Sequence, residues 1–151
     1  MFKIFTSFTF EGTEEIQIEI SESISEISLN SVDLEIFNAK FISNDILDSY
    51  DLEISLNNEL LKLDFGQDVL PQSGILKIDF KGVLSDDLKG FYKASYKDEN
   101  NNVKYLATTQ FEATDARRAF PCWDEPAFKS TFSVKLCVPD KFSAVSKYTM
   151  F

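Results

Sequence analysis

Apolar and polar residues alternate along most of the chain, which is the pattern of half-buried β-strands. The clearest case is residues 15–20, where Ile16, Ile18 and Ile20 share one face and three polar residues share the other. No stretch of ten or more residues shows the 3.6-residue period of a helix. Short strands at this spacing predict an all-β fold, an antiparallel sandwich or a curved sheet. The other predicted strands cover residues 24–29, 32–36, 52–56, 60–65, 75–80, 90–96, 103–111 and 131–138.

Turn-forming residues separate these segments. Asn57 and Asn58 predict a hairpin turn, because asparagine tolerates positive φ. Residues 71–74 and 98–102 are further turn sequences, and Gly82 is expected to end the strand before it. Another strand is predicted to begin at residues 142–145, shortly before the last residue, Phe151. We therefore expect one partial domain over residues 1–151, a sandwich-like fold that is incomplete at its C-terminus and leaves a strand edge open.

Composition narrows the function classes. The chain has 151 residues, 44% of them hydrophobic, and 15 phenylalanines, which is typical of a folded domain. Its net charge is −10 and its longest basic run is two arginines, so nucleic-acid binding is not expected. No window approaches the roughly 20 apolar residues of a membrane span. The N-terminus does not resemble a signal peptide, so we expect a cytoplasmic protein.

The chain contains no histidine. This excludes a Ser-His-Asp triad, Cys-His chemistry and the HExxH zinc motif from these residues. Catalysis by carboxylates or lysine stays open, although nothing else in the sequence organises such a site. The two cysteines, Cys122 and Cys137, do not form a CxxC pair. We interpret them as free buried thiols, with a disulfide as the open alternative.

Residues 107–132 depart from simple alternation and are rich in charged, aromatic and proline residues. If residues 103–112 form one strand, Gln110 and Glu112 share a face and Phe111 points into the sandwich. An amide oxygen and a carboxylate side by side can accept hydrogen bonds from an ammonium group. The alternative is a solvated strand face that binds nothing.

Arg117 and Arg118 lie between Asp115 and Asp124. They predict either a loop held by salt bridges or an anion-binding pair, and the local excess of acids favours the salt bridges. Trp123 and Phe128 are expected to hold this loop against the core. Cys122 is interpreted as a buried thiol in preference to a reactive one.

The segment TTQFEATDARRAFPCWDEPAFKSTF resembles a signature of the N-terminal domain of gluzincin zinc aminopeptidases, the family of aminopeptidase N and puromycin-sensitive aminopeptidase. Residues 74–80 and 82–92 extend the resemblance upstream. It implies a saddle-shaped, mostly antiparallel β domain beside a thermolysin-like catalytic domain. That catalytic domain carries HExxH, a distal glutamate ligand and GAMEN, none of which occurs here. The resemblance therefore implies zinc in the full-length protein but no catalytic residue and no metal ligand in this chain.

By position, the resemblance gives Glu112 a role in binding the α-ammonium of a peptide substrate and Gln110 a role in lining the first specificity pocket. The predicted function is part of a zinc metalloaminopeptidase that removes N-terminal residues from peptides. Its expected partners are the peptide N-terminus and the missing catalytic domain, and the chain alone is predicted to be inactive. A stand-alone interaction module and a nonfunctional truncated copy are the alternatives.

Overall fold

A computed structural model describes residues 1–4, 7–44 and 48–146. Within these residues the chain forms eleven β-strands, one 3₁₀ turn at Ala116–Arg118 and no α-helix, which confirms the all-β prediction. The strands are β1 (Phe2–Ile4), β2 (Thr9–Ile20), β3 (Ile24–Asn30), β4 (Leu34–Ser43), β5 (Ser49–Asp51), β6 (Glu53–Asn57), β7 (Leu60–Val69), β8 (Gln72–Val83), β9 (Gly90–Lys97), β10 (Val103–Gln110) and β11 (Leu136–Cys137).

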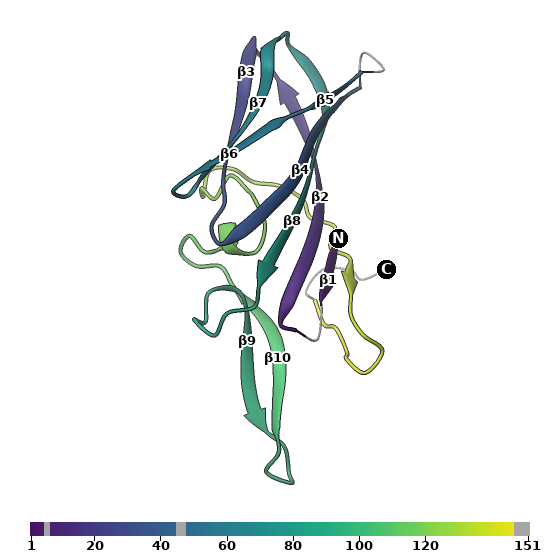
Figure 1. The fold of residues 1–151 in the computed structure, drawn as a ribbon, viewed down its shortest axis with the longest axis vertical. Coiled ribbons are helices and arrows are strands. Elements are labelled where there is room, and N and C mark those ends of the chain that lie inside the picture. Colours follow the sequence, from purple (N-terminus) through teal and green to yellow (C-terminus); the bar gives the residue numbers. More distant parts are fainter. Residues whose placement is uncertain (5–6, 45–47, 147–151) are drawn as a thin grey trace.

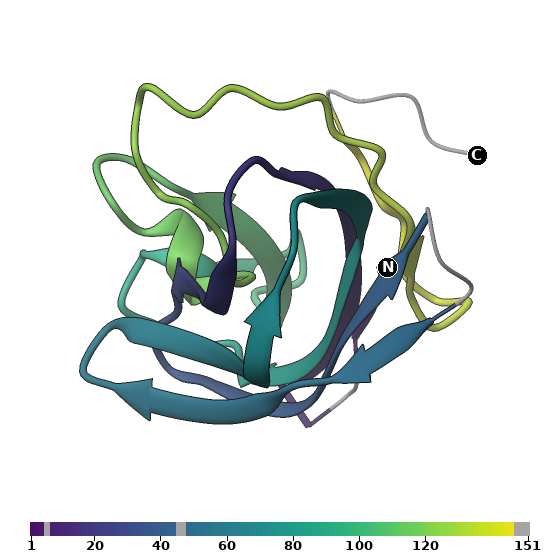
Figure 2. The ribbon, with the colours of Figure 1, turned by 90° about the horizontal axis from the view of Figure 1, so that it is seen from above.

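The strands form three sheets, of six, three and two strands. Their orders are β11-β1-β2-β8-β4-β5, β3-β7-β6 and β10-β9. All pairs are antiparallel except β1 with β11. The β9–β10 hairpin projects from one end of an elongated molecule (Figure 1). Seen from above, the two larger sheets curve around a shared interior (Figure 2).

The interior is filled by large apolar side chains from the inner faces of the two larger sheets. Leu76, Ile78 and Phe80 lie on one face of β8 and are fully buried, as the alternation predicts. Leu61 and Leu63 of β7 face them from the three-stranded sheet. Burying each such side chain contributes about 1.5–3 kcal/mol, so the two sheets stabilise one another.

Two glycines of β8 lie inside the strand, where the sequence suggested turns. Gly82 does not end β8, and Gly74 belongs to the strand and not to the preceding turn. A Cβ atom at Gly82 would lie 2.3 Å from the Phe10 ring, and one at Gly74 would lie 2.3 Å from the Phe41 ring. Both glycines therefore leave space for a buried phenylalanine of a neighbouring strand.

The two strands predicted near the C-terminus do not form as predicted. Of the strand predicted at 131–138, only β11 forms, and Phe132 is exposed. No strand forms over residues 142–145. β11 pairs in parallel with Phe2 and Lys3 of β1, so it adds a two-residue strand to the edge of the six-stranded sheet.

Glu14 interrupts the apolar face of β2. It lies on the same side of the strand as Gly12 and Ile16, so it points into the core. Its Oε1 atom is buried and has no hydrogen-bond partner among the described residues. Burial raises the pKa of Glu14 to about 8, against the opposing effect of the Met1 amino group. The fold therefore favours the protonated acid.

Glu14 should make the stability of the chain depend on pH. Its pKa is higher in the folded chain than the ordinary value of 4.5, so the folded state holds its proton longer. We expect the free energy of unfolding to decrease as pH rises from 4.5 to about 8, by up to about 1.4 kcal/mol per pH unit. Urea unfolding across this range measures the effect. Glu14→Gln should remove the decrease, whereas Glu15→Gln on the solvated face should retain it; a decrease that persists in Glu14→Gln would contradict the assignment.

Candidate functional site

The β9–β10 hairpin carries the segment that the sequence singled out. Asp98 shapes its tip, because its carboxylate accepts hydrogen bonds from the backbone N–H groups of Asn100 and Asn102, at 3.0 and 2.9 Å. At its root, Phe91 is buried in the core. The Tyr105 ring lies 5.1 Å from the Phe8 ring, in an edge-to-face contact. The root is thus fixed to the body while the tip extends into solvent.

Gln110 and Glu112 both lie at the root of the hairpin, but not on one strand. Gln110 is the last residue of β10 and pairs with Gly90, the first residue of β9. Glu112 lies in a turn that the Asp115 N–H closes by donating to the Phe111 carbonyl, at 2.9 Å. The peptide bond between Glu112 and Ala113 is cis. Because β10 ends at Gln110, Gln110 and Glu112 do not share a strand face, and that part of the prediction is wrong.

Both side chains are exposed, and Glu112 makes no hydrogen bond or ion pair with any of the described residues. Phe111, which was expected inside the sandwich, lies at the surface instead. Its ring packs edge-to-face against Phe120, with 5.9 Å between ring centroids. The Phe111 contact holds one end of the turn, and the Glu112 carboxylate faces solvent.

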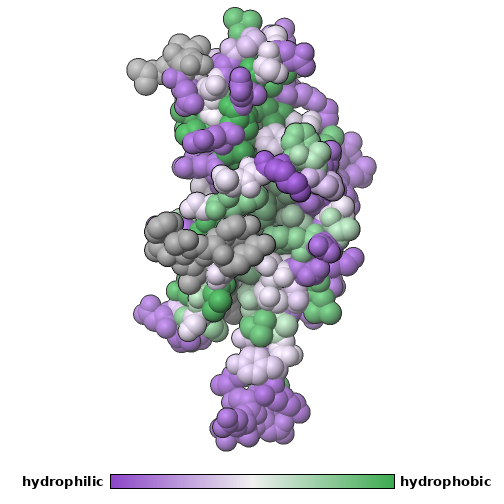
Figure 3. Space-filling view, turned by 180° about the vertical axis from the view of Figure 1, so that it is seen from behind, coloured by the Kyte–Doolittle hydropathy of each residue, from purple (hydrophilic) through white to green (hydrophobic). Residues whose placement is uncertain are grey.

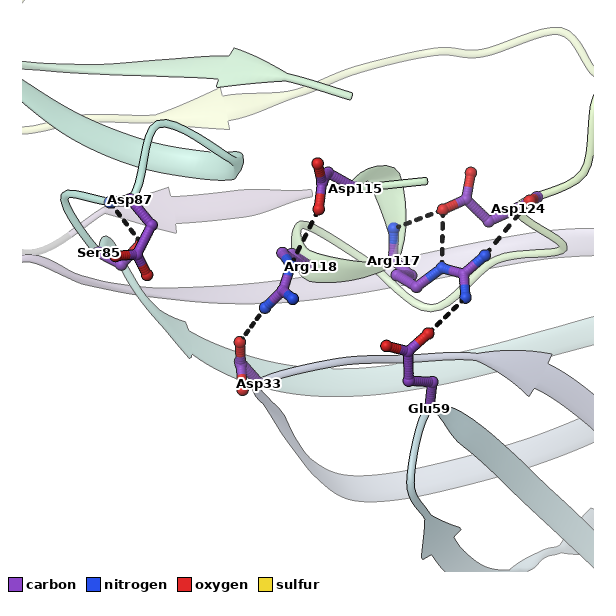
Figure 4. Close-up of polar contacts among 8 residues, drawn as sticks. All are labelled: Asp33, Glu59, Ser85, Asp87, Asp115, Arg117, Arg118 and Asp124. Atoms are coloured by element: carbon purple, nitrogen blue, oxygen red, sulfur yellow. Dashed lines mark hydrogen bonds and ion pairs between the residues drawn. The ribbon is translucent and has the colours of Figure 1, made fainter. Parts of the chain in front are cut away.

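Arg117 binds one carboxylate within the loop that follows this turn and one in another part of the chain (Figure 4). Its Nε donates to Asp124 at 2.9 Å and its Nη1 donates to Glu59 at 2.8 Å. Glu59 belongs to the tight turn between β6 and β7, next to Asn58 at φ 56°. The side chains of Arg117 and Asp124 are each only 13% exposed. Hydrogen bonds to ionised groups are stronger than neutral ones, so the pair with Asp124 fixes the loop internally and the pair with Glu59 joins it to the β6–β7 turn.

Arg118 makes a second set of contacts on the opposite side of the 3₁₀ turn. Its Nε donates to the Asp115 carboxylate at 3.0 Å, and its Nη1 donates to Asp33 in the connection between β3 and β4. Both guanidinium groups thus bind carboxylates of the chain itself. The interpretation of a loop held by salt bridges is confirmed.

Backbone hydrogen bonds reinforce these ion pairs. Asn30 and Cys122 exchange two of them, at 2.8 and 3.0 Å, and the Val32 N–H donates to the Arg117 carbonyl at 2.9 Å. Trp123 packs against the core, as predicted, but Phe128 is 61% exposed and does not. The loop is therefore an added layer on the β3–β7 side of the fold.

Cys122 is not placed to supply a nucleophile. Cys122 and Cys137 are both free and half-buried. Burial is the main reason that the pKa of Cys122 is raised to about 12; the negative charges of Asp124 and Glu14 also raise it, and Arg117 lowers it. A thiol with so high a pKa stays protonated and is a poor nucleophile. The buried-thiol interpretation of Cys122 is confirmed.

An open pocket of about 320 Å³ lies beside Arg118, and neither Gln110 nor Glu112 lines it. Its walls bring together Asp33, Asp87, Lys89 and Arg118, with Phe91 at the apolar side. Ser85 accepts a hydrogen bond there from the Asp87 N–H, at 3.3 Å. No base is placed against this hydroxyl among the contacts of the described residues, so the pocket lacks the arrangement of a nucleophile with its base.

The residues of this chain do not fit a zinc ion. Zinc sites use histidine, cysteine and carboxylate ligands, and the sequence has no histidine. In the part of the chain that the structure describes, no group of three or more cysteine, aspartate or glutamate residues could hold a metal ion.

The same described residues include no helix long and apolar enough to cross a membrane.

The fold is an all-β domain, and the loop at its hairpin root carries the segment that resembles a family signature. Residues 1–150 match the peptidase M1 N-terminal domain family, and the chain belongs to that family. It is 42% identical to aminopeptidase M1 of Arabidopsis thaliana over 144 residues, which are 91% of this chain. It is 38% identical to puromycin-sensitive aminopeptidase of Caenorhabditis elegans over 92% of the chain. The family resemblance in the sequence is confirmed.

The relatives are much longer than this chain. The matched region covers 16% of the Arabidopsis protein, 14% of aminopeptidase 2 of Candida albicans and 15% of the Caenorhabditis elegans protein. The Candida protein is 41% identical over 91% of this chain. The chain therefore spans about one sixth of the length of the relatives that it matches.

Replacing Arg117 should destabilise the chain strongly. Arg117→Ala leaves the Asp124 carboxylate in a largely buried position without its partner, which costs about 2–4 kcal/mol of unfolding free energy. Lys62→Ala is the matched control, because it removes an ion pair with Glu26 in which both side chains are more than 40% exposed. The control should cost less than about 1 kcal/mol. Urea unfolding at neutral pH compares the two, and equal losses would show that Arg117 is an ordinary surface residue.

Proposed function

We propose that this chain is the substrate-anchoring domain of an M1 aminopeptidase. In this proposal Glu112 binds the free α-ammonium of a peptide, and Gln110 lines the pocket for the first residue. One observation carries the proposal: the acids beside Glu112 in the loop, Asp115 and Asp124, are both bound by arginines, whereas Glu112 faces solvent without such a partner. A carboxylate on a fixed turn is available to a ligand.

The chemistry of an ammonium group suits this pair of residues. An ammonium has three donors and no acceptor, so it requires oxygen acceptors, and a carboxylate gives the strongest hydrogen bonds. Gln110, which offers an amide oxygen, precedes Glu112 by two residues at the same root of the hairpin. A site that must hold a free ammonium rejects internal peptide bonds, because these offer only a neutral amide. Such anchoring would restrict an enzyme to the N-terminal residue.

Peptide-bond hydrolysis belongs, in this proposal, to a catalytic domain that lies outside these 151 residues. The zinc ion that the family resemblance implies would be held there, since the chain has no histidine and no group of its described residues fits the ion. The names of the relatives as aminopeptidases support this division, as does the small share of their length that the chain covers. A cytoplasmic location stays a prediction from the sequence.

The exposed face of the hairpin is the proposed docking surface for the catalytic domain. The strand register places Tyr92, Tyr96 and Leu106 on the same face as Gln110. Tyr96 is 53% exposed and Leu106 is 43% exposed. An isolated two-stranded hairpin is marginally stable in water, so a partner that covers this face would stabilise it. The tip of the hairpin is hydrophilic (Figure 3), and along this face Tyr92 and Leu106 lie closer to Gln110 than Tyr96 does. A domain that covers this face would meet the proposed anchor directly.

A stand-alone interaction module is the second candidate function. The same apolar hairpin face favours it, because a separate protein could cover Tyr96 and Leu106 just as a catalytic domain could. The two candidates differ in what Glu112 does: the module requires no contribution from Glu112 to peptide hydrolysis.

Glu112→Gln tests the anchor in an extended protein, meaning residues 1–151 joined to the catalytic domain of a family member. The substitution retains the size of the side chain but removes its charge, so we expect KM for unblocked peptide substrates to rise at least about tenfold. Glu125→Gln, an exposed acid of the same loop, should change KM less than about twofold. Neither substitution should alter the unfolding free energy of the 151-residue chain by more than about 0.5 kcal/mol. An unchanged KM in Glu112→Gln would exclude the anchoring role.

Leu106→Asp tests the docking surface. A charge on this face would have to be buried against the catalytic domain, so we expect hydrolysis by the extended protein to decrease at least about tenfold. Val103→Asp is the matched control, because Val103 is 53% exposed on the same strand but points to the opposite face. The control should retain most of the activity, and both variants of the isolated chain should melt near the wild-type temperature. Equal losses of hydrolysis in the two variants would show that the catalytic domain does not dock on the Leu106 face in particular, and would contradict the proposed docking surface.

A further inference from the structure

Arg118 contacts both segments that carry the proposed anchor. Its Nε binds the Asp115 carboxylate at 3.0 Å, and its backbone N–H donates to the Asp115 carbonyl at 3.2 Å. Asp115 in turn closes the turn of Glu112 through its N–H bond to Phe111, at 2.9 Å. The position of Glu112 therefore depends on Asp115, and the position of Asp115 depends on Arg118.

The second connection leads to Gln110. Gly90, the cross-strand partner of Gln110, has φ +63° and packs directly on Arg118. A Cβ atom at Gly90 would lie 2.5 Å from the Arg118 Cβ and 3.1 Å from the Asp115 carbonyl oxygen. The first residue of β9 thus packs on the 3₁₀ turn. The position of β10 follows from that of β9, because the two strands are hydrogen-bonded to each other.

Asp33 connects Arg118 to the body of the fold. It lies in the connection between β3 and β4, far from the hairpin in sequence, and accepts a hydrogen bond from the Nη1 of Arg118. One guanidinium group thus joins the body of the fold to the Glu112 turn (Figure 4). Lysine could not reproduce this, because its single ammonium lacks the two diverging N–H directions of the guanidinium fork.

We propose that Arg118 is a positioning residue that sets Gln110 and Glu112 relative to each other and to the body of the domain. The proposal deepens the anchoring function proposed above and rests on it. Arg118 itself contacts no substrate; it acts through Asp115 on Glu112 and through Gly90 on Gln110. Arg117, its neighbour on the same 3₁₀ turn, binds Asp124 and Glu59 and fixes only the far side of the loop.

The first test uses the 151-residue chain and needs no activity. Arg118→Lys should accelerate amide hydrogen exchange at Asp115 at least about tenfold, because the Asp115 N–H closes this turn by donating to the Phe111 carbonyl and the turn loses its tether. Arg117→Lys is the matched control and should leave exchange at Asp115 within about twofold of the wild type. Equal exchange in Arg118→Lys and in the wild type would overturn the proposal.

The second test separates positioning from stability in the extended protein. Arg118→Lys should lower kcat/KM for unblocked peptides at least about tenfold, because small misplacements of a binding group are costly. Adding Glu112→Gln should lower it no further, since Arg118 acts through Glu112. Arg117→Lys, with a comparable decrease in melting temperature, should retain kcat/KM within about twofold.

Two outcomes separate this proposal from the anchoring function on which it rests. If Glu112→Gln alone leaves kcat/KM unchanged, the anchoring function is wrong and this proposal is wrong with it. If Glu112→Gln lowers kcat/KM but Arg118→Lys does not, or if the two losses add fully, the anchor stands and the positioning role is wrong. Asp33→Asn, on a side chain that is 76% exposed, gives the same comparison if Arg118→Lys does not fold.

Discussion

The ordered form of the signature loop depends on a pair of adjacent arginines. Residues 111–128 form no sheet of their own, and only Cys122 pairs with a strand residue, Asn30. What holds the loop in place is Arg117 on one side of the 3₁₀ turn and Arg118 on the other, each bound to a carboxylate of the loop and to one in a turn of the β body. Removing either guanidinium would free a loop end and leave carboxylates unpaired.

The arginine pair also explains how a charged loop can lie against an apolar core. Desolvating ions is costly, and the cost is offset only where each charge has hydrogen-bond partners. Arg117 and Asp124 satisfy this condition, with contacts at 2.9 Å between their side chains. Glu112 lies outside the network and stays hydrated. The same loop thus combines acids used for structure with exposed acids, of which the proposal assigns Glu112 to a ligand.

The sequence was sufficient for the strands and faces set by alternation, because a period of two leaves one choice of buried face. Ile16 and Ile18 of β2 and Leu76 of β8 follow directly from it. It was insufficient where a tertiary neighbour decides: Gly82 is paired on both sides within the sheet and leaves space for Phe10, and the strand predicted at residues 131–138 forms only where it meets Phe2 and Lys3 of β1. Gln110 and Glu112 could be named from the family signature, but their relative position could not, since it depends on a turn closed by Asp115 and on Arg118.

Hydrolysis by the chain itself is the most direct test of the central claim, which is that these residues anchor a peptide and supply no chemistry. Unblocked aminoacyl substrates would be incubated with the purified 151-residue chain and with the extended protein, both with added zinc. The account predicts hydrolysis only by the extended protein, because the chain has no histidine and residues 1–4, 7–44 and 48–146 contain no group that fits the metal. Zinc-dependent hydrolysis by the 151-residue chain alone would contradict the account and require a catalytic site free of histidine.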